Sequence, residues 1–88
     1  MWFTYVLRSF KNKRLYTGFT SDINRRLKEH NSKKGGDYSS KNAPFELIFF
    51  EAYKDKRDAT SAEKYFKTGH GREVLKDKVK YSLINDAP

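Results

Sequence analysis

Two short runs rich in aromatic and β-branched residues, 2–7 and 15–20, lie close together near the start of the chain. Such runs are typical of β-strands, and the polar connection between them, residues 9–13, contains an asparagine that favours a turn. The two runs are therefore predicted to form a hairpin. Because side chains alternate between the faces of a strand, Tyr5 and Tyr16 share a face if the hairpin loop has an even number of residues.

A helical pattern follows the hairpin over residues 23–30. The preceding residues Ser21 and Asp22 supply a candidate N-cap. Apolar or partly apolar side chains then recur at i, i+4 and i+7 and should face the core. This stripe consists of Ile23, Leu27 and His30.

Arg26 stands on the border of this stripe, because it follows its first member by three residues and precedes its last by four. We therefore expect its guanidinium to lie beside the core and not on the solvent face. Arg25 points further outward and can pair with Glu29 at i,i+4.

A polar segment, residues 31–44, separates this helix from the next apolar run. It contains two adjacent glycines and several serines and asparagines, which predict a flexible basic loop long enough to suggest a function. Its lysines are candidate phosphate contacts, although lysines in such loops often serve only solubility. They are Lys33, Lys34 and Lys41.

Residues 45–53 form a nearly continuous apolar run and are predicted to be the third and best-buried strand. Asp55 then caps a helix that runs through Lys67 and stops at Gly69. The apolar stripe of this helix consists of Ala59, Ala62 and Phe66. Glu63 lies beside that stripe, because it follows the first member by four residues.

A last helix is predicted over residues 72–80, with three side chains turned inward, namely Val74, Leu75 and Val79. Residues 81–88 are assigned to a C-terminal tail, of which the last four residues should be loose. The resulting domain, residues 1–80, belongs to the α/β class. We expect a three-stranded, largely antiparallel sheet flanked by about three helices.

The length of 88 residues supports a single domain. A domain of this size buries only about 60% of the surface of its unfolded chain, and seven Phe, six Tyr and one Trp provide the large apolar side chains that it needs. The absence of cysteine excludes disulfides and cysteine-ligated zinc. No apolar run approaches membrane-spanning length and no signal peptide is evident, so a cytoplasmic location without membrane attachment is expected.

The net charge of +8 is unevenly distributed. Residues 1–44 contain ten Lys or Arg against three acids, and residues 45–88 contain nine against eight. An excess of this kind favours a polyanionic partner, of which nucleic acid is the commonest, although a well-solvated basic surface has the same composition.

The common catalytic signatures are absent from the sequence: there is no glycine-rich phosphate loop, no nucleophile elbow and no zinc-protease motif. Two histidines without cysteines make a closed zinc site improbable. The remaining side chains with chemistry are two tyrosines on the hairpin, two polar residues on the following helix and one carboxylate on a later one. They are Tyr5, Tyr16, Arg26, His30 and Glu63.

In order and spacing these residues resemble the GIY-YIG nuclease family. The first tripeptide of the family corresponds to residues 3–5 and the second to residues 16–18. Arg26 follows Tyr16 by ten residues, as the catalytic arginine of the family does, and His30 matches a histidine seen in many members. Residues 59–67 resemble the glutamate helix of the family.

The resemblance covers residues 1–80, nearly the whole chain, and points to the small, single-domain bacterial members. It extends to the N-terminal catalytic domain of the excision-repair incision subunit and to homing endonucleases. The first tripeptide keeps only Tyr5, and Thr17 replaces the isoleucine of the second. Those positions are mainly structural, so the expected fold is unaffected, while the shape of the pocket is left open.

By this resemblance the chain is a divalent-metal-dependent endonuclease that hydrolyses DNA phosphodiester bonds in repair or processing. Arg26 would donate to the anionic phosphorane that forms during hydrolysis. Glu63 would hold one Mg²⁺ or Mn²⁺ ion. Tyr5 is the candidate general base, assisted by Tyr16, and His30 is the rival base.

Nucleic-acid contacts are expected from Arg25, from Lys67 and from the three lysines of the basic loop. DNA is favoured over RNA as the partner. No separate recognition module fits into 88 residues, so cutting should be structure-dependent or weakly sequence-selective, and a partner protein could supply further specificity.

Taken singly, each of these residues has an ordinary structural interpretation. Tyr5 and Tyr16 could be strand aromatics, Arg26 a surface partner of Asp22, and Glu63 a partner of Lys67 one helical turn away. Two other functions therefore stay open. One is a non-catalytic nucleic-acid-binding module with the same fold, and the other is an interaction module for an acidic protein.

Overall fold

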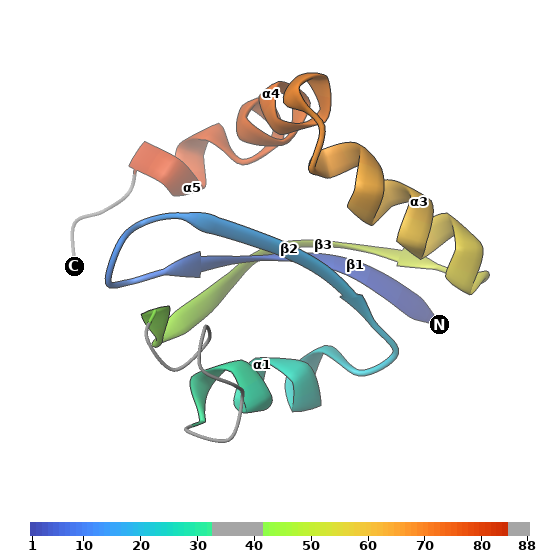
Figure 1. The fold of residues 1–88 in the computed structure, drawn as a ribbon, viewed down its shortest axis with the longest axis horizontal. Helices are drawn as coiled ribbons and strands as arrows, with labels where there is room; N and C mark the ends of the chain where they lie inside the picture. The colour runs from blue at the N-terminus through green and yellow to red at the C-terminus, as the bar shows by residue number, and fades with distance from the viewer. Residues whose placement is uncertain (33–41, 85–88) are drawn as a thin grey trace.

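The computed structural model describes residues 1–32 and 42–84. The three loop lysines named above lie outside these ranges. A three-stranded sheet forms the centre of the molecule (Figure 1), and its order is β2-β1-β3 with both pairs antiparallel. Its strands are β1 (Trp2–Ser9), β2 (Leu15–Thr20) and β3 (Phe45–Tyr53). The expected α/β fold with a largely antiparallel sheet is confirmed.

The first two strands form the predicted hairpin. Tyr5 pairs with Gly18 and Leu7 pairs with Tyr16, so both tyrosines point to one face of the sheet. The hydroxyl of Ser9 holds the turn by accepting hydrogen bonds from the backbone amides of Lys11 and Asn12 at 3.0 and 3.2 Å. The condition on the hairpin loop is therefore met.

The best-buried strand is β1, and the expectation that residues 45–53 would be best buried is wrong. Strand β1 pairs on both sides and is covered on both faces, so residues 4–9 are buried throughout. Strand β3 is an edge strand, and the side chain of Phe50 is 51% exposed. An apolar run indicates that a strand is hydrophobic, but it does not indicate whether the strand lies at the centre or the edge of the sheet. That position depends on pairing between distant segments.

Helix α1 (Ile23–Asn31) covers one face of the sheet, while α3 (Lys56–Phe66), α4 (Gly69–Lys78) and α5 (Lys80–Ile84) cover the other (Figure 1). Each face has its own apolar core. The core beneath α1 contains Tyr5, Leu7 and Phe45, together with the predicted α1 residues Ile23 and Leu27. The core beneath α3 and α4 contains Val6, Phe66, Leu75 and Val79.

Two helix starts are as predicted. Asp22 caps α1 by accepting from the amide of Arg25 at 3.0 Å, and Asp55 caps α3 by accepting from the amide of Arg57 at 2.8 Å. Of the two cap candidates before α1, Ser21 and Asp22, the aspartate is the cap. The caps fix the entry of both helices that carry candidate site residues.

The junction between the second and third of the predicted helices differs from expectation. Helix α3 ends at Phe66, and Gly69 opens α4 instead of stopping α3, because the hydroxyl of Thr68 accepts from the amide of Gly71 at 3.0 Å and caps a new helix. Helix α4 thus begins three residues before the predicted start at Arg72. Gly71 permits the tight turn, since a Cβ there would overlap the carbonyl of Tyr65.

Residues 80–84, most of which were assigned to a tail, form α5. The guanidinium of Arg8 donates to the carbonyls of Ser82 and Leu83 at 3.3 and 3.4 Å, and the side chain of Leu83 packs against the core beneath α4. Cations stabilise the carbonyl end of a helix in this way. Within the described ranges, no helix has the length and apolar character needed to cross a membrane.

Candidate active site

An open cleft of about 1310 Å³ runs along the edge strand β2, and all six residues of that strand line it. Because β2 is an edge, side chains from both layers of helices reach the cleft around it. Helix α1 contributes Arg26, Glu29 and His30 from one face of the sheet. Glu63 of α3 and Lys67, the residue that caps its end, come from the other face. The predicted tyrosines, arginine, histidine and glutamate all line this cleft.

Tyr5, Arg26 and His30 are in direct contact. The Tyr5 hydroxyl lies 3.2 Å from Nε2 of His30, and Nε of Arg26 donates to that hydroxyl at 3.4 Å. The ring of His30 also packs edge-on against Phe45 at 5.8 Å between centroids, which fixes its orientation. The helical spacing of Arg26 and His30 brings both to one tyrosine of the sheet.

The environment favours neutral forms of the tyrosine and the histidine. Burial raises the pKa of Tyr5, and the hydrogen bond and charge of Arg26 oppose this only in part. Burial, together with the charge of Arg26, lowers the pKa of His30. The hydroxyl of Tyr5 can therefore accept from Arg26 and donate to Nε2 of a neutral His30.

Arg26 is held in place from its own helix. Its Nη1 donates to Oε2 of Glu29 at 2.8 Å, and Glu29 also pairs with Arg25 at 3.6 Å. The pair of Arg26 with Asp22 considered from sequence is thus replaced by one with Glu29. Hydrogen bonds to Tyr5 and Glu29 raise the pKa of Arg26 further, so its charge is permanent.

Gly18 makes room for the Tyr5 side chain. The two residues are opposite each other in the hairpin, and a Cβ placed on Gly18 would lie 2.5 Å from the Tyr5 hydroxyl. Glycine at this point of the second tripeptide therefore lets the phenol lie across β2 and reach the cleft. The resemblance to the second tripeptide identifies this glycine, and the pairing of Gly18 with Tyr5 gives the physical reason for it.

Substitution of Gly18 by alanine is expected to displace the Tyr5 ring and break its contact with His30. We expect a loss of stability of about 1–3 kcal/mol, as is typical of overpacking, together with a loss of any cleavage activity. Thermal unfolding and a cleavage assay measure the two effects. Gly69→Ala is the matched control, because a Cβ at Gly69 meets no atom within 4 Å. Equal behaviour of the two variants would contradict the role given to Gly18.

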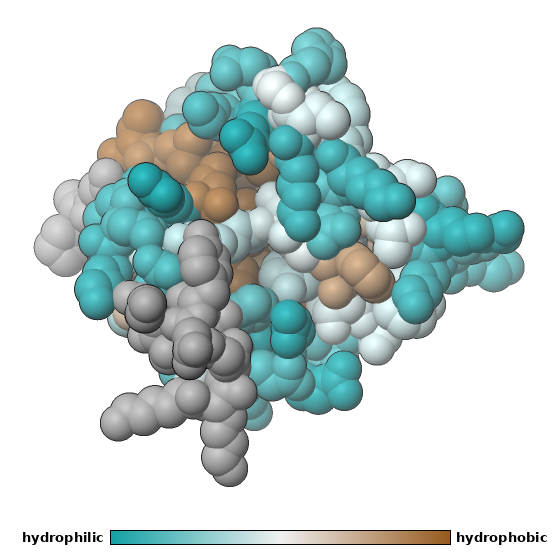
Figure 2. All heavy atoms as spheres, in the orientation of Figure 1, coloured by the Kyte–Doolittle hydropathy of each residue, from teal (hydrophilic) through white to brown (hydrophobic). Residues whose placement is uncertain are grey.

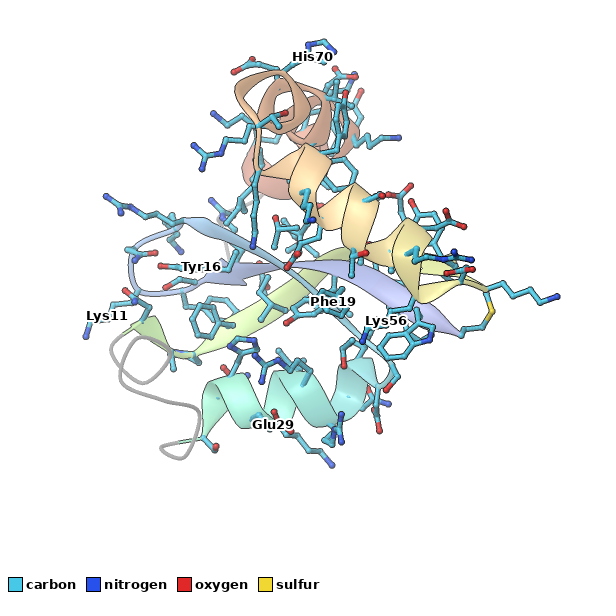
Figure 3. The ribbon with its side chains drawn as sticks, turned by 45° about the vertical axis from the view of Figure 1, so that its right-hand side comes forward. Lys11, Tyr16, Phe19, Glu29, Lys56 and His70 are labelled. Atoms are coloured by element: carbon cyan, nitrogen blue, oxygen red, sulfur yellow. The ribbon has the colours of Figure 1, made fainter. Side chains whose placement is uncertain are left out.

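Tyr16 lines the same cleft but is outside the contact between Tyr5 and His30. Its hydroxyl accepts from Nδ2 of Asn12 at 3.1 Å, and its ring packs edge-on against Phe45 at 5.1 Å. Figure 3 shows Tyr16 on the hairpin and Glu29 on α1. The second tyrosine is thus oriented by the hairpin turn and can offer a hydroxyl edge to a ligand in the cleft.

Glu63 faces the cleft from α3. Its side chain is only 17% exposed, and Oε2 accepts from Nζ of Lys67 at 3.3 Å. Its charge raises the pKa of Tyr5, which indicates that the two groups interact electrostatically although they come from opposite faces of the sheet. The Glu63–Lys67 pair is the ordinary pairing considered from sequence, and it lies within the cleft.

The donor set fits a hard divalent cation that keeps most of its water. Among the described residues, no three His, Cys, Asp or Glu side chains cluster to form a complete metal cage. One carboxylate beside an open, water-accessible cleft suits Mg²⁺, which is commonly held by one or two carboxylates plus substrate oxygens. The same set does not suit zinc or a two-metal site.

Cations surround the cleft. Its lining among the described residues includes seven Lys or Arg against two Glu. Of the predicted nucleic-acid contacts, Arg25 and Lys67 are part of this lining. Sequence reasoning missed four further cations, namely Lys13, Arg14, Arg72 and Lys76. Hydrophilic side chains dominate the helices in Figure 2, and apolar side chains gather over α5.

The missed cations carried weak signals in the sequence. Lys13 and Arg14 belong to the loop of the hairpin, and Lys13 has a positive φ of 63°. Arg72 and Lys76 stand four residues apart and therefore on one face of α4. Both belong to the second half of the chain, in which basic and acidic residues nearly balance. The net charge of that half therefore gave no sign that these two cations point to the cleft together.

The cleft brings a tyrosine–histidine pair, an arginine and the carboxylate of Glu63 together on a small α/β scaffold, and its basic lining suits an anionic ligand. The family model of the GIY-YIG catalytic domain matches residues 1–77. The chain belongs to the GIY-YIG catalytic-domain family.

Relatives resemble this sequence over most of its length. The chain is 45% identical over 65 residues to the UPF0213 protein YazA of Bacillus subtilis, a match that spans 74% of this chain and 65% of that protein. It is 36% identical over 85 residues to the UPF0213 protein YsiG of Lactococcus lactis, spanning 97% and 81%. The chain thus spans just under two thirds of the length of YazA.

The fold also resembles a solved structure. The solution NMR structure of the UPF0213 protein BH0048 from Bacillus halodurans is 31% identical in sequence and superposes with a TM-score of 0.56. The match covers 97% of this chain and 95% of that one. The likeness to this structure over nearly the full length of both chains supports the assignment to a small, single-domain form of the family.

Proposed function

We propose that the protein is an endonuclease that hydrolyses phosphodiester bonds of DNA with the help of one Mg²⁺ or Mn²⁺ ion. The observation that carries the proposal is the meeting of Arg26, the Tyr5–His30 pair and Glu63 at one basic cleft. Membership of a family of catalytic domains supports it. A cytoplasmic role in DNA repair or processing is part of the same proposal.

Arg26 is the residue that stabilises the transition state. Phosphodiester hydrolysis gathers negative charge on the non-bridging oxygens, and a planar guanidinium can donate two hydrogen bonds to them. Nε and Nη1 of Arg26 are already aligned on Tyr5 and Glu29. Substrate binding can exchange the Glu29 carboxylate for a phosphate oxygen of similar charge and geometry.

Tyr5 and His30 form a route for the proton of the attacking water. The water gives its proton to the Tyr5 hydroxyl as that hydroxyl gives its own proton to Nε2 of His30. The water oxygen then forms a bond to phosphorus, and the bond to the leaving oxygen breaks with its electron pair passing to that oxygen, which takes a proton from solvent. His30 holds the proton of the attacking water as imidazolium and afterwards releases it to solvent. This route needs a neutral histidine and no phenolate, which agrees with the directions in which burial moves the two pKa values.

Glu63 would hold the metal ion, and Lys67, which is now paired with Glu63, would then be available to a phosphate. When bound, the ion supplies charge neutralisation at the phosphate and Lewis-acid activation. The Glu63 carboxylate is restricted by partial burial, so it presents its oxygens to the cleft in a fixed direction. A single carboxylate leaves room for substrate oxygens and water around the ion.

The proton route gives a defined pH dependence. The pKa of His30 lies below its ordinary value of about 6.5, so His30 is neutral at neutral pH and the rate should be flat there. Below the pKa the imidazole is protonated, cannot accept a proton, and the rate should fall about tenfold per pH unit. Measurement of kcat/KM against pH tests this.

His70 provides the control for that profile. It is on α4, well away from Tyr16 and Glu29 (Figure 3), and its ring packs against Tyr65 at 6.1 Å. His70→Gln should keep the acid limb of the profile, and His30→Gln should lower the rate and remove the limb. An unchanged acid limb in His30→Gln would assign the proton acceptor elsewhere.

A non-catalytic nucleic-acid-binding module is the second candidate function. One observation favours it: the guanidinium of Arg26 and the carboxylate of Glu63 are each ion-paired within the protein, at 2.8 and 3.3 Å. Metal titration separates the two functions. The nuclease binds Mn²⁺ through Glu63 and cleaves, whereas the module binds DNA with the same salt dependence whether or not metal is present.

A further inference from the structure

An aromatic pair with a lysine above it lies beside the proposed catalytic groups. The rings of Trp2 and Phe19 are 6.3 Å apart and tilted by 45°. Nζ of Lys56 lies 5.0 Å from the centre of the Trp2 ring and 5.8 Å from that of Phe19. Figure 3 shows Phe19 and Lys56 near each other, where the end of β2 meets the start of α3.

Both rings belong to the cleft and not to the cores. Trp2 and Phe19 line the cleft together with Tyr5 and Arg26, and neither ring is among the residues of the two apolar clusters described above. Burial of the hydrophobic core therefore does not account for these two large aromatic side chains. A ring that borders a basic cleft offers its face to a ligand within it.

The pair shares the cleft with the reacting groups but belongs to the other face of the sheet. Phe19 directly follows Gly18, against which the Tyr5 phenol lies, and pairs with Thr4. Because successive side chains of a strand point to opposite faces, Phe19 lies on the α3 face, from which Glu63 also enters the cleft. The cleft passes around the edge strand β2, so a DNA strand whose phosphate is at Arg26 and Tyr5 can continue around that edge to the Trp2–Phe19 pair.

We propose that Trp2 and Phe19 form a stacking site for an unpaired nucleobase of a single DNA strand, with Lys56 contacting a phosphate of that strand. This inference rests on the proposed function and deepens it, because it names the state of the substrate next to the cut. Lys56 now lies over both rings, where an incoming base would lie, and its flexible chain allows the ammonium to turn to the backbone.

Stacking requires the flat face of a base, and this explains why the site selects an unpaired one. In a duplex both faces of each base are covered by neighbours, so an aromatic side chain cannot reach them without unstacking. Every base has such a face, so the site tolerates any sequence. The preference would therefore be for strand state, in agreement with structure-dependent cutting.

Trp2 is the single tryptophan of the chain and reports directly on the site. The experiment adds oligothymidine, or a blunt duplex of equal length, to the full chain without divalent metal, so that binding is separated from cleavage. We expect oligothymidine to quench the tryptophan fluorescence and the duplex to bind without quenching. Fluorescence anisotropy of labelled DNA gives the two affinities.

Variants test the residues. Trp2→Leu should weaken oligothymidine binding by about 5- to 100-fold, the range for loss of one stacked base. Lys56→Gln should reduce the slope of log affinity against log salt by about one. The matched control is Lys80 over the Tyr81 ring at 5.4 Å, a pair that is absent from the cleft lining. Tyr81→Leu and Lys80→Gln should leave binding and slope unchanged.

The outcomes separate this proposal from the proposed function. Salt-sensitive binding of oligothymidine without quenching, and with unchanged affinity of Trp2→Leu and unchanged slope of Lys56→Gln, would overturn the stacking site and leave the nuclease proposal intact. Equal quenching by the duplex would also overturn it. Failure of both DNAs to bind at all would overturn both proposals. Lys56 is exposed at the start of a helix, so Lys56→Gln remains informative even if Trp2→Leu fails to fold.

Discussion

Replacement of Arg26 by alanine is expected to slow DNA cleavage by about 10²- to 10³-fold, the usual effect of removing one preorganised donor to a developing oxyanion. The effect should be on kcat, because the guanidinium is proposed to bind the transition state more strongly than the substrate. Stability should hardly change. The Arg26–Glu29 pair joins side chains that are 44% and 43% exposed, and exposed pairs contribute about 0–1 kcal/mol.

Arg57 is the matched control for Arg26. It also pairs with a carboxylate at 2.8 Å, that of Asp55, but it is 89% exposed and is not part of the cleft lining. Arg57→Ala should keep full activity. If Arg26→Ala cleaved DNA as fast as Arg57→Ala while remaining folded, the catalytic assignment of Arg26 would be wrong.

Replacement of Glu63 by glutamine should remove metal-supported cleavage almost completely. Even groups that only orient metal ligands commonly affect metal affinity or activity 10- to 100-fold, so the loss of the one proposed protein ligand should be about a hundredfold or more. Glutamine preserves the shape of the side chain and can still accept from Lys67. Binding of Mn²⁺, followed by titration calorimetry, should be lost together with activity.

Asp77→Asn is the control for that variant. Asp77 also pairs with a nearby lysine, Lys80, at 3.9 Å. Its side chain is 80% exposed, however, and is absent from the cleft lining. Its replacement should affect neither Mn²⁺ binding nor cleavage. Loss of Mn²⁺ binding in both variants would indicate that the ion senses overall charge and not a site at Glu63.

The local features of the fold were predictable because short-range chemistry determines them. The hairpin, the caps at Asp22 and Asp55, and the stripe that turns Ile23 and Leu27 inward all follow from residues a few positions apart. The border position of Arg26 follows from the same helical spacing, and the structure brings it to Tyr5. Resemblance to a known family supplied the order of the site residues along the chain.

Other features depended on contacts between distant segments and could not be read from local patterns. The centre of the sheet is β1 and not the more apolar β3, since strand order arises from pairing. Helix α5 is stabilised by Arg8, more than seventy residues earlier. Gly69 is a typical helix stop, but Thr68 before it caps a new helix with its side chain, so Gly69 becomes the first residue of α4.

The basic lining of the cleft also depends on contacts between distant segments and was only partly predictable. Cations from the hairpin, α1, α3 and α4 converge on one edge strand, although two of these helices come from the half of the chain with balanced charge. The protonation states were also beyond sequence. A base made of Tyr5 alone requires a lowered pKa, whereas burial raises the pKa of Tyr5, and the proposed proton route therefore ends on His30.

The most direct test of the account is a cleavage panel of single-stranded, nicked, branched and duplex DNA, with matched RNA, in the presence of Mg²⁺ or Mn²⁺. The wild-type protein and Glu63→Gln are assayed side by side at equal concentration. We expect metal-dependent cleavage of at least one DNA with unpaired nucleotides by the wild-type protein, and about a hundredfold less by the variant. Equal cleavage by both proteins, or none of any substrate despite salt-sensitive binding, would contradict a metal-dependent nuclease site at Glu63.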